Sequence, residues 1–336
     1  MRLRVTPSFS RILNASRVWG SYHWSRLTGR MLAPSYPVSI SIEPTTSCNL
    51  RCPECPSGLR SFTRPTGSIA PELFRSIIDQ VSGKVIYLTF YFQGEPYLHP
   101  AFNEMVEYAA SKKVFTVTST NGHYLDPEKA EAIVRSGLGR LIISLDGMSQ
   151  QTYERYRIGG ELDTVLQGIR NMVKAKSELR SSSPEIVVQF IVMEHNKHER
   201  SIVREAFRDL IDVKIIFKTV QVYDFENGNS LIPKEKELSR YYLNGTGKFK
   251  IDNHLEDHCW KMWHSCVITW DGKVVPCCFD KDAKYVMGDI NKTSLGEIWH
   301  SDAYSRFRTS LLKGRKEIEI CKNCSEGSRV QLSPEV

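Results

Sequence analysis

The sequence lacks the features that mark membrane-spanning, secreted and nucleic-acid-binding proteins. No run of about 18 apolar residues occurs, so no helix is expected to cross a membrane. The nine cysteines are an odd number in two clusters, with no secretory apolar segment before them. This pattern favours metal ligation in a reducing compartment, the cytoplasm, over disulfides. The net charge is +7, but residues 1–42 contain six arginines and no acid, so the remaining body is almost neutral and no nucleic-acid partner is expected.

Residues 1–37 form a basic, aromatic arm. Its large apolar residues are Phe9, Ile12, Leu13, Trp19, Trp24 and Leu27. Phe9, Ile12 and Leu13, with Trp19 beside them, fit one helical face, as in an interfacial helix that makes peripheral membrane contact. An organellar transit peptide has a similar composition. The main expectation is an arm that packs on the body through its aromatic residues.

Three closely spaced cysteines, Cys48, Cys52 and Cys55, follow the apolar run 38–42. A structural zinc or an electron-transfer cluster takes four protein ligands, whereas this motif supplies three. A cubane held by three cysteines leaves one iron open to bind a substrate or cosubstrate. The alternatives are three loop thiols, or half of a zinc site that is completed elsewhere.

From residue 38 to about residue 222, strand-like runs alternate with helical patterns. The runs are Val38–Glu43, Val85–Tyr91, Val114–Ser119, Leu141–Asp146, Ile186–Met193 and Val213–Val220. Between them, Phe102, Met105, Val106 and Ala109 share one helical face, and another helix opens with Asp126 as N-cap and Pro127 at N1. Six β/α units in series predict a parallel sheet curled toward a barrel, with its active site at the carboxyl ends of the strands.

The spacing of Cys48, Cys52 and Cys55 resembles the CxxxCxxC signature of the radical S-adenosylmethionine (radical SAM) superfamily. The resemblance implies an α/β fold with a (β/α)6 partial TIM barrel over residues 38–225. It also implies a [4Fe–4S] cluster whose open iron is chelated by the methionine part of SAM. A flavodoxin- or ferredoxin-type protein would donate the electron.

The strand ends supply the SAM contacts that the resemblance implies. Gln93-Gly94-Glu95 resembles the family's GGE motif, with Gln93 in place of the first glycine, whereas the literal Gly159-Gly160-Glu161 follows a helical stretch and is interpreted as a turn. The other candidate contacts are Asn121, Ser144, Asp146 and Arg157, of which Arg157 would pair with the methionine carboxylate. One departure is Glu54, which stands where the family often has an aromatic residue.

After a polar connector at 226–258, residues 259–336 form a small cysteine-rich part with a hairpin that turns at Asp271-Gly272. It resembles the SPASM/twitch extension of radical SAM enzymes, which binds an auxiliary [4Fe–4S] cluster. The resemblance implies Cys259, Cys277, Cys321 and Cys324 as ligands, and Cys266 or Cys278 could replace one of them. A zinc ribbon is the alternative.

The resemblance implies chemistry by a 5′-deoxyadenosyl radical that takes a hydrogen atom from the substrate. A cluster with four thiolates has no open iron and suits electron transfer. The ligand spacing resembles that of single-cluster dehydrogenases in the superfamily, so we expect a two-electron oxidation of a sugar-like or aminocyclitol alcohol. Asp280 is the candidate base for the hydroxyl proton. The alternatives are a maturase that modifies a peptide substrate and a non-enzymatic metal-binding protein.

Overall fold

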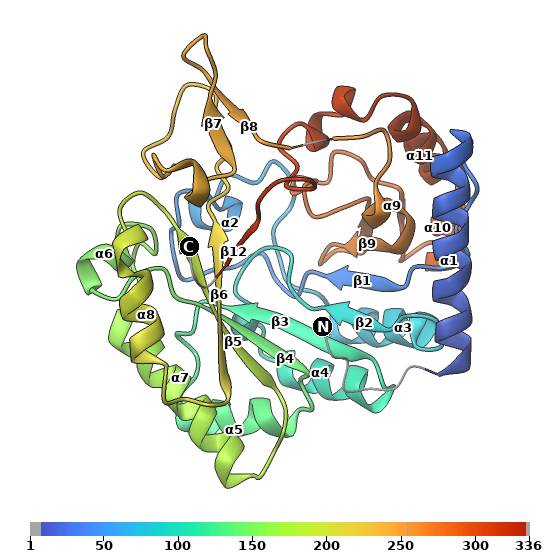
Figure 1. Cartoon of the computed structure of the whole chain (residues 1–336). Coiled ribbons are helices and arrows are strands. Elements are labelled where there is room, and N and C mark those ends of the chain that lie inside the picture. The colour runs from blue at the N-terminus through green and yellow to red at the C-terminus, as the bar shows by residue number, and fades with distance from the viewer. Residues whose placement is uncertain (1–7, 254, 334–336) are drawn as a thin grey trace.

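In the computed structural model, which describes residues 8–253 and 255–333, the chain is organised around one curved sheet (Figure 1). Its centre is six parallel strands in chain order: β1 Ser39–Ile42, β2 Tyr87–Thr89, β3 Phe115–Thr120, β4 Arg140–Ser144, β5 Glu185–Val192 and β6 Val213–Thr219. The sheet is open, with β11 at one edge and β12 (Gln331–Leu332) at the other. The predicted α/β partial barrel with a small cysteine-containing C-terminal part is therefore confirmed.

The six strands form where the sequence has β-branched and aromatic runs, because both faces of the sheet are buried. In β5, Ile186 and Val188 pack with the helices of the main core. Val187 points the other way and packs with Phe115 and Ile142 inside the barrel. The predicted site residues Gly94, Asn121 and Asp146 come after the ends of β2, β3 and β4.

Helices cover the outer face of the six strands (Figure 1). They are α3 Pro71–Val81, α4 Phe102–Ser111, α5 Pro127–Arg135, α7 Leu162–Glu178 and α8 Arg200–Ala206. The predicted start of α5 is confirmed, since the Asp126 side chain accepts a hydrogen bond from the backbone nitrogen of Lys129. Shorter helical segments lie in the connections: α2 Pro56–Leu59, α6 Gln150–Glu154, and 3₁₀ helices Pro96–Leu98, Lys197–Glu199, Lys236–Leu238, Arg315–Glu317 and Glu319–Cys321.

The cysteine-rich C-terminal part continues the sheet of the barrel. Strand β9 (Ser265–Ile268) pairs in parallel with β1, with Cys266 opposite Ile40. The predicted hairpin brings β10 (Lys273–Val275) antiparallel to β9, and β11 (Gly288–Asp289) follows. Helices α9 Trp260–His264, α10 Leu295–Trp299 and α11 Asp302–Gly314 surround these strands.

Between the two parts, residues 226–258 contain a second, small sheet. Strands β7 (Tyr241–Leu243) and β8 (Phe249–Ile251) form an antiparallel hairpin that projects from the body (Figure 1). Tyr241 stacks on Phe225, with ring centroids 4.9 Å apart. The stretch that the sequence presents as a polar connector thus carries ordered structure.

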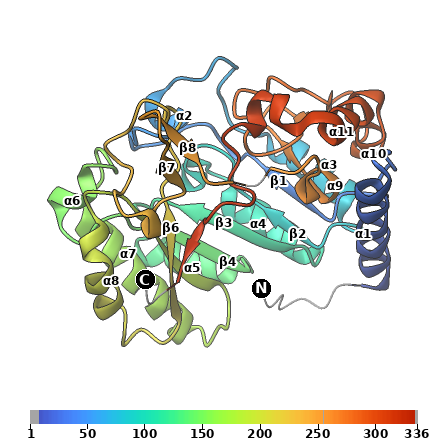
Figure 2. The ribbon, with the colours of Figure 1, turned by 45° about the horizontal axis from the view of Figure 1, so that its top comes forward.

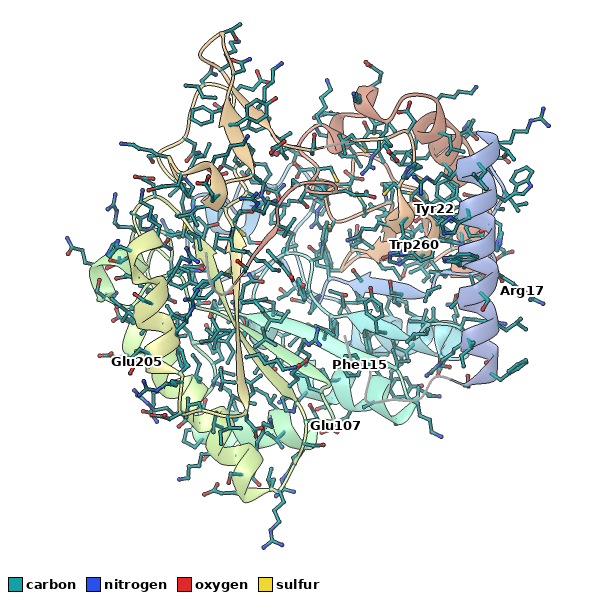
Figure 3. All side chains as sticks on the ribbon, in the orientation of Figure 1. Arg17, Tyr22, Glu107, Phe115, Glu205 and Trp260 are labelled. Carbon is teal, nitrogen blue, oxygen red and sulfur yellow. The ribbon has the colours of Figure 1, made fainter. Side chains whose placement is uncertain are left out.

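The N-terminal arm forms one helix, α1 (Phe9–Thr28), along one side of the molecule (Figures 1 and 2). The expectation that it packs through its aromatic residues is wrong for Phe9, Trp19 and Trp24, which are exposed. Tyr22 is the aromatic residue that faces the body, where it meets Trp260 at a centroid distance of 5.1 Å (Figure 3). No helix within 8–253 and 255–333 combines the length and apolar character needed to span a membrane.

Candidate active site

The three thiols of the loop after β1 line one cavity of about 120 Å³ at the carboxyl ends of the strands. The loop is tightly packed: a Cβ on Gly58 would lie 2.5 Å from the backbone nitrogen of Cys52, so α2 can approach only with glycine there. Burial raises the pKa of Cys48 to about 11 and also raises that of Cys52. Buried thiols of this kind become thiolates when a cationic metal group binds, so the donor set fits an iron–sulfur cluster.

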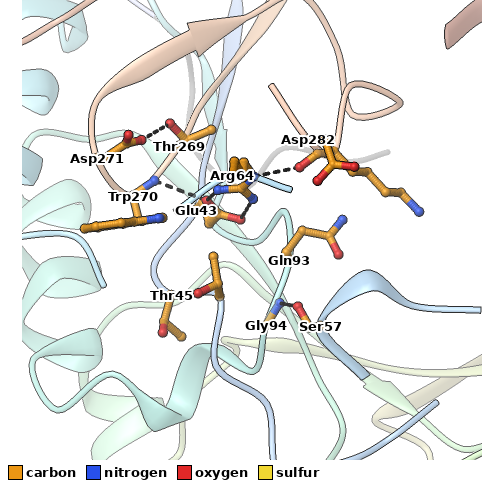
Figure 4. Close-up of polar contacts among 12 residues, drawn as sticks. Glu43, Thr45, Ser57, Arg64, Gln93, Gly94, Thr269, Trp270, Asp271 and Asp282 are labelled. Atoms are coloured by element: carbon orange, nitrogen blue, oxygen red, sulfur yellow. Dashed lines mark hydrogen bonds and ion pairs between the residues drawn. The ribbon is translucent and has the colours of Figure 1, made fainter. Parts of the chain in front are cut away.

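Gly94 and Glu95 form another part of the same cavity wall. Gly94 has a φ of +74°, and a Cβ there would lie 2.2 Å from the Thr45 carbonyl oxygen, so only glycine fits. Its backbone nitrogen donates to Ser57 Oγ at 2.8 Å (Figure 4). The Glu95 carboxyl accepts from Thr120 Oγ1 and from the backbone nitrogen of Asn121, each at 2.7 Å.

Burial raises the pKa of Glu95 to about 7 in spite of these hydrogen bonds. A buried carboxyl regains its charge when a cation is placed beside it. Glu95 is therefore suited to receive an ammonium group at the cavity.

Arg157 connects the end of β4 with the cysteine loop. Its Nε and Nη2 each lie 2.6 Å from Asp146 Oδ2, and its Nη1 lies 3.6 Å from Cys52 Sγ. Burial opposes the charge, but Asp146 and Cys52 hold the pKa of Arg157 above its usual value. Asp146 is fixed in turn by the backbone nitrogen of Ile191, which donates to its Oδ1 at 2.7 Å.

The cavity brings most of the sequence-predicted SAM contacts together with the three thiols. The lining residues from that set are Gly94, Glu95, Asn121, Ser144 and Arg157. The Asn121 amide nitrogen lies 2.7 Å from Asn49 Oδ1 and 3.9 Å from Cys48 Sγ. Asp146 is not among the lining residues and pairs with Arg157, while Gly159-Gly160-Glu161 lies in the connection between α6 and α7.

A second cavity, of about 340 Å³, gathers the C-terminal cysteines. It is lined by Cys259, Cys277, Cys278, Cys321 and Cys324, whereas Cys266 is buried in β9 opposite Ile40. Cys278 therefore remains as the alternative ligand in this cavity. Within the described ranges, no three His, Cys, Asp or Glu side chains are grouped to hold a single metal ion. Thiols spread around a cavity suit a multi-iron cluster, which needs its donors at separate corners.

Two cations face the thiols of this second cavity. Lys261 Nζ lies 3.2 Å from Cys278 Sγ, and Arg315 Nη2 lies 3.4 Å from Cys324 Sγ. The neighbouring Cys278 raises the pKa of Lys261. Positive groups next to sulfur ligands offset the negative charge of a thiolate-bound cluster. Sequence reasoning missed both cations, although the position of Lys261 two residues after Cys259 was an available signal.

A third cavity, of about 450 Å³, adjoins both cysteine sites. Its wall includes Pro56, the residue after Cys55, and Phe279, which also lines the second cavity. Five charged residues line it: Asp280, Lys281, Asp282, Lys284 and Glu319.

Asp280 is buried at the base of the loop that forms this wall. Its two carboxyl oxygens accept from the backbone nitrogens of Lys284 and Tyr285, at 2.8 and 2.9 Å. Burial raises its pKa. The structure thus places the candidate base at the cavity, in a fixed orientation.

The unusual residue Glu54 has a structural partner in the connector. Its Oε2 accepts from the backbone nitrogen of Tyr223 at 2.8 Å, and its Oε1 accepts from Asn229 Nδ2 at 2.9 Å. The cysteine loop is therefore attached to residues 223–229. Sequence reasoning noted Glu54 as a departure but had no signal for these partners.

A buried ion pair joins the cysteine loop region to the C-terminal part (Figure 4). Arg64 Nη1 and Nη2 donate to the two oxygens of Glu43 at 2.9 and 2.6 Å. Glu43 also accepts from the backbone nitrogen of Trp270 at 3.2 Å, and Arg64 Nε donates to the Lys281 carbonyl at 2.7 Å. One pair thus fixes the end of β1, the hairpin and the wall of the third cavity.

Comparisons with known proteins agree with this geometry. A family model described as "Radical SAM superfamily" matches residues 42–205, and one described as "Iron-sulfur cluster-binding domain" (SPASM) matches residues 259–325. The AdoMet-dependent heme synthase of Methanosarcina barkeri is 31% identical over 330 residues, which cover 86% of this chain and 91% of that protein. The chain belongs to the radical SAM superfamily. It is an enzyme that uses SAM and [4Fe–4S] clusters, so the zinc ribbon and the non-enzymatic metal-binding protein are set aside.

Two further similarities bear on this radical SAM enzyme. The S-adenosyl-L-methionine-dependent 2-deoxy-scyllo-inosamine dehydrogenase of Niallia circulans is 23% identical over 296 residues, covering 86% of this chain and 93% of that protein. The crystal structure of Streptococcus suis SuiB bound to precursor peptide SuiA has a TM-score of 0.62 at 13% identity. It covers 96% of this chain and 78% of that one, and it shows the same fold.

Proposed function

We propose that this radical SAM enzyme is an oxidoreductase that removes two electrons from an alcohol of a sugar-like or aminocyclitol substrate. The observation that carries the proposal is the third cavity, which shares Phe279 with the second cavity, includes Pro56 next to Cys55, and is lined by both acidic and basic side chains. Hydroxyl and amino groups of a small polar molecule would find partners of both kinds there. The similarity to the Niallia circulans dehydrogenase supports the same substrate class.

When bound, SAM at the first site supplies a hydrogen-abstracting 5′-deoxyadenosyl radical, and the auxiliary cluster supplies an electron acceptor. Cys48, Cys52 and Cys55 would hold the first cluster. Arg157 would bind the methionine carboxylate and Glu95 its ammonium group, because a guanidinium and a buried carboxyl face that cavity. Asn121 and Ser144 would contact the ribose.

In the second cavity, Cys259, Cys277, Cys321 and Cys324 would hold the auxiliary cluster. Asp280 would take the hydroxyl proton, since its orientation is fixed and burial raises its pKa toward that of a useful base. The substrate would thus lose a hydrogen atom from carbon, a proton to Asp280 and one electron. A flavodoxin- or ferredoxin-type donor and the cytoplasm, which keeps thiols reduced, complete the proposal.

The second candidate is a peptide-modifying maturase. A cavity of about 450 Å³ has the size of a small-molecule site, whereas an extended peptide is bound in most known modes along a groove or a sheet edge. The cavity therefore favours the small-molecule oxidation.

The test uses anaerobically reconstituted enzyme and a panel of aminocyclitols and hexoses deuterated at their carbinol carbons. We expect deuterium in 5′-deoxyadenosine and a ketone product from at least one compound. Asp280→Asn should abolish ketone formation, and the control change Asp163→Asn, at an exposed position of α7, should not. Loss of Cys321 and Cys324 should leave 5′-deoxyadenosine formation uncoupled from product. Deuterium transfer from none of the panel, with transfer from a deuterated peptide, would favour the maturase.

A further inference from the structure

Helix α1 packs with its polar side inward. The residues that it buries are Arg11, Asn14, Val18, Ser21, Tyr22 and Ser25. Its large apolar residues face outward: Phe9 is 81% exposed, Trp19 60%, Trp24 44% and Leu27 84%, and Ile12 and Leu13 are exposed beside them. This is the reverse of the arrangement in a surface helix whose apolar stripe faces the core.

The inward polarity has a local explanation. Arg11 donates to the carbonyl oxygens of Ser82 and Lys112, at 3.0 and 2.9 Å, and Asn14 donates to the Tyr36 carbonyl at 3.2 Å. These carbonyls belong to the segments that lead into β2, β3 and β1. Buried carbonyls need donors, so the inner face of α1 must be polar. The need to pair these buried carbonyls explains the polar inner face of α1, but it does not explain the apolar residues on the outer face.

The outer apolar residues share one side of the helix. At 3.6 residues per turn, the six apolar residues span an arc of about 140°, and the six buried residues span about 100° on the opposite side. Ser16, Gly20 and His23 share the outer arc. The helix of 20 residues therefore carries an apolar stripe near each end of its outer side, Phe9, Ile12 and Leu13 in one and Trp19, Trp24 and Leu27 in the other, with Ser16 between them.

Arginines border these apolar residues on both sides. Arg17 lies along one margin and Arg26 along the other, and Arg30 follows the end of the helix. Figure 3 shows Arg17 directed away from the body. Arg26 lies 3.4 Å from Glu256 Oε2, which offsets part of its charge. Residues 1–42 contribute no acidic side chain to this side of the molecule.

We propose that α1 lies flat on an anionic lipid surface. Its outer apolar residues would enter the boundary between headgroups and acyl chains, where tryptophan is favoured, and the bordering arginines would contact acidic headgroups. A protein partner would supply acidic residues to match the arginines, but a second copy of this chain would bring its own basic α1. Charge therefore favours lipid over self-association.

The position of α1 sets the orientation of the bound enzyme. The helix lies across the segments that precede β1, β2 and β3, whereas the cysteine loop lies beyond the other ends of these strands (Figures 1 and 2). On a lipid surface, the cysteine loop and the first cavity would lie at the strand ends farther from the bilayer. The second cavity would lie nearer to it, because its wall includes Trp260, which contacts Tyr22 of α1.

The experiment is co-sedimentation of the full-length reconstituted enzyme with vesicles. One set contains phosphatidylcholine alone and the other an equimolar mixture of phosphatidylcholine and phosphatidylglycerol. We expect binding to the anionic set that is at least about tenfold tighter and that weakens with salt. Trp19→Ser/Trp24→Ser should weaken it about tenfold or more, and Arg17→Gln/Arg30→Gln should remove the preference for anionic lipid. The control Ile211→Ser, at a residue 96% exposed elsewhere, should bind as the parent does.

All variants should keep the parent circular dichroism spectrum, because the changed side chains face solvent. Absence of binding to both vesicle sets would overturn the proposal, as would equal binding to both. Light scattering tests whether α1 instead pairs with a second copy of this chain. That pairing would be shown by a concentration-dependent dimer that disappears in Trp19→Ser/Trp24→Ser, without any vesicle binding.

Discussion

Arg157 lies between Asp146 and Cys52, with its guanidinium 2.6 Å from the Asp146 carboxylate and 3.6 Å from the Cys52 sulfur. Asp146 belongs to the segment after β4, and Cys52 belongs to the loop after β1. The Asp146 carboxylate therefore orients the Arg157 guanidinium at the first cavity from one side, and the Cys52 sulfur limits the position of the guanidinium from the other. Arg157 also lines the first cavity, and a guanidinium at that position suits a carboxylate ligand.

Replacing Arg157 tests this arrangement. Arg157→Ala should weaken SAM binding roughly ten- to a hundredfold, since a lost charge-assisted contact in a closed site costs about 1.5–3 kcal/mol. Iron and sulfide content should not change. The measurement is SAM affinity by equilibrium dialysis, with Arg155→Ala, an exposed arginine two residues away, as control. Equal affinity in the parent and in Arg157→Ala would place the methionine carboxylate elsewhere.

The two cysteine sets should be separable by iron analysis. The triple change of Cys48, Cys52 and Cys55 to Ala should leave one [4Fe–4S] cluster and abolish SAM cleavage, because the second cavity retains its own thiols. The readouts are iron, acid-labile sulfide and 5′-deoxyadenosine. Zinc without sulfide in the triple variant would contradict an iron–sulfur auxiliary site.

Within the C-terminal set, Cys266 should differ from the rest. Cys266→Ser should keep the full iron content, because this thiol is buried in β9 away from the second cavity. Cys321→Ser should lose iron. If Cys266→Ser loses as much iron as Cys321→Ser, the ligand assignment must be revised.

The buried pair Glu43–Arg64 should dominate the stability of the junction. Arg64→Ala leaves the Glu43 carboxyl buried without its partner and should lower the free energy of unfolding by about 3–5 kcal/mol. Urea unfolding under anaerobic conditions measures the loss, with the exposed Arg170→Ala as control. Adding Glu43→Gln should recover part of it, because no buried charge then remains. Similar losses in both arginine variants would argue against a special role for the pair.

Glu95 should give the unfolding free energy a pH dependence. Its pKa is raised by burial from 4.5 to about 7, so between these values the folded protein binds more protons than the unfolded chain. Its contribution to stability is therefore fully present below about pH 4.5 and is lost as pH rises through about 7. Unfolding of the cluster-free protein across this range should show the fall, and Glu95→Gln should flatten it. A parallel fall in both proteins would assign the effect to other groups.

The sequence predicts the barrel well because its signals are local. Runs such as Val213–Val220 have the β-branched content of buried strands, and Asp126-Pro127 starts a helix through its own hydrogen bond and fixed φ. The strand-end residues converge because parallel strands share one edge. Asn121 and Ser144 could therefore be placed at the same site as Glu95 without knowing any distance.

The features that the sequence does not reveal depend on distant partners. Glu43 and Arg64 are each ordinary charged residues until the fold buries them together, and the same holds for Arg315 and Cys324. The packing of α1 was mispredicted for a related reason. Periodicity identifies an apolar face, but the carbonyls that Arg11 satisfies lie about 70 to 100 residues away and decide which face turns inward.

The pairing of β9 with β1 has a consequence for the distance between the two cysteine sites. The cysteine loop follows β1, and the C-terminal cysteines surround its neighbour β9. The two sites therefore cannot move apart, as hinged domains do, without breaking the backbone hydrogen bonds between β1 and β9. The spacing between the two sites is thus set by the pairing of β1 with β9. If the auxiliary cluster accepts an electron as proposed, this fixed spacing would keep the transfer distance constant from one turnover to the next.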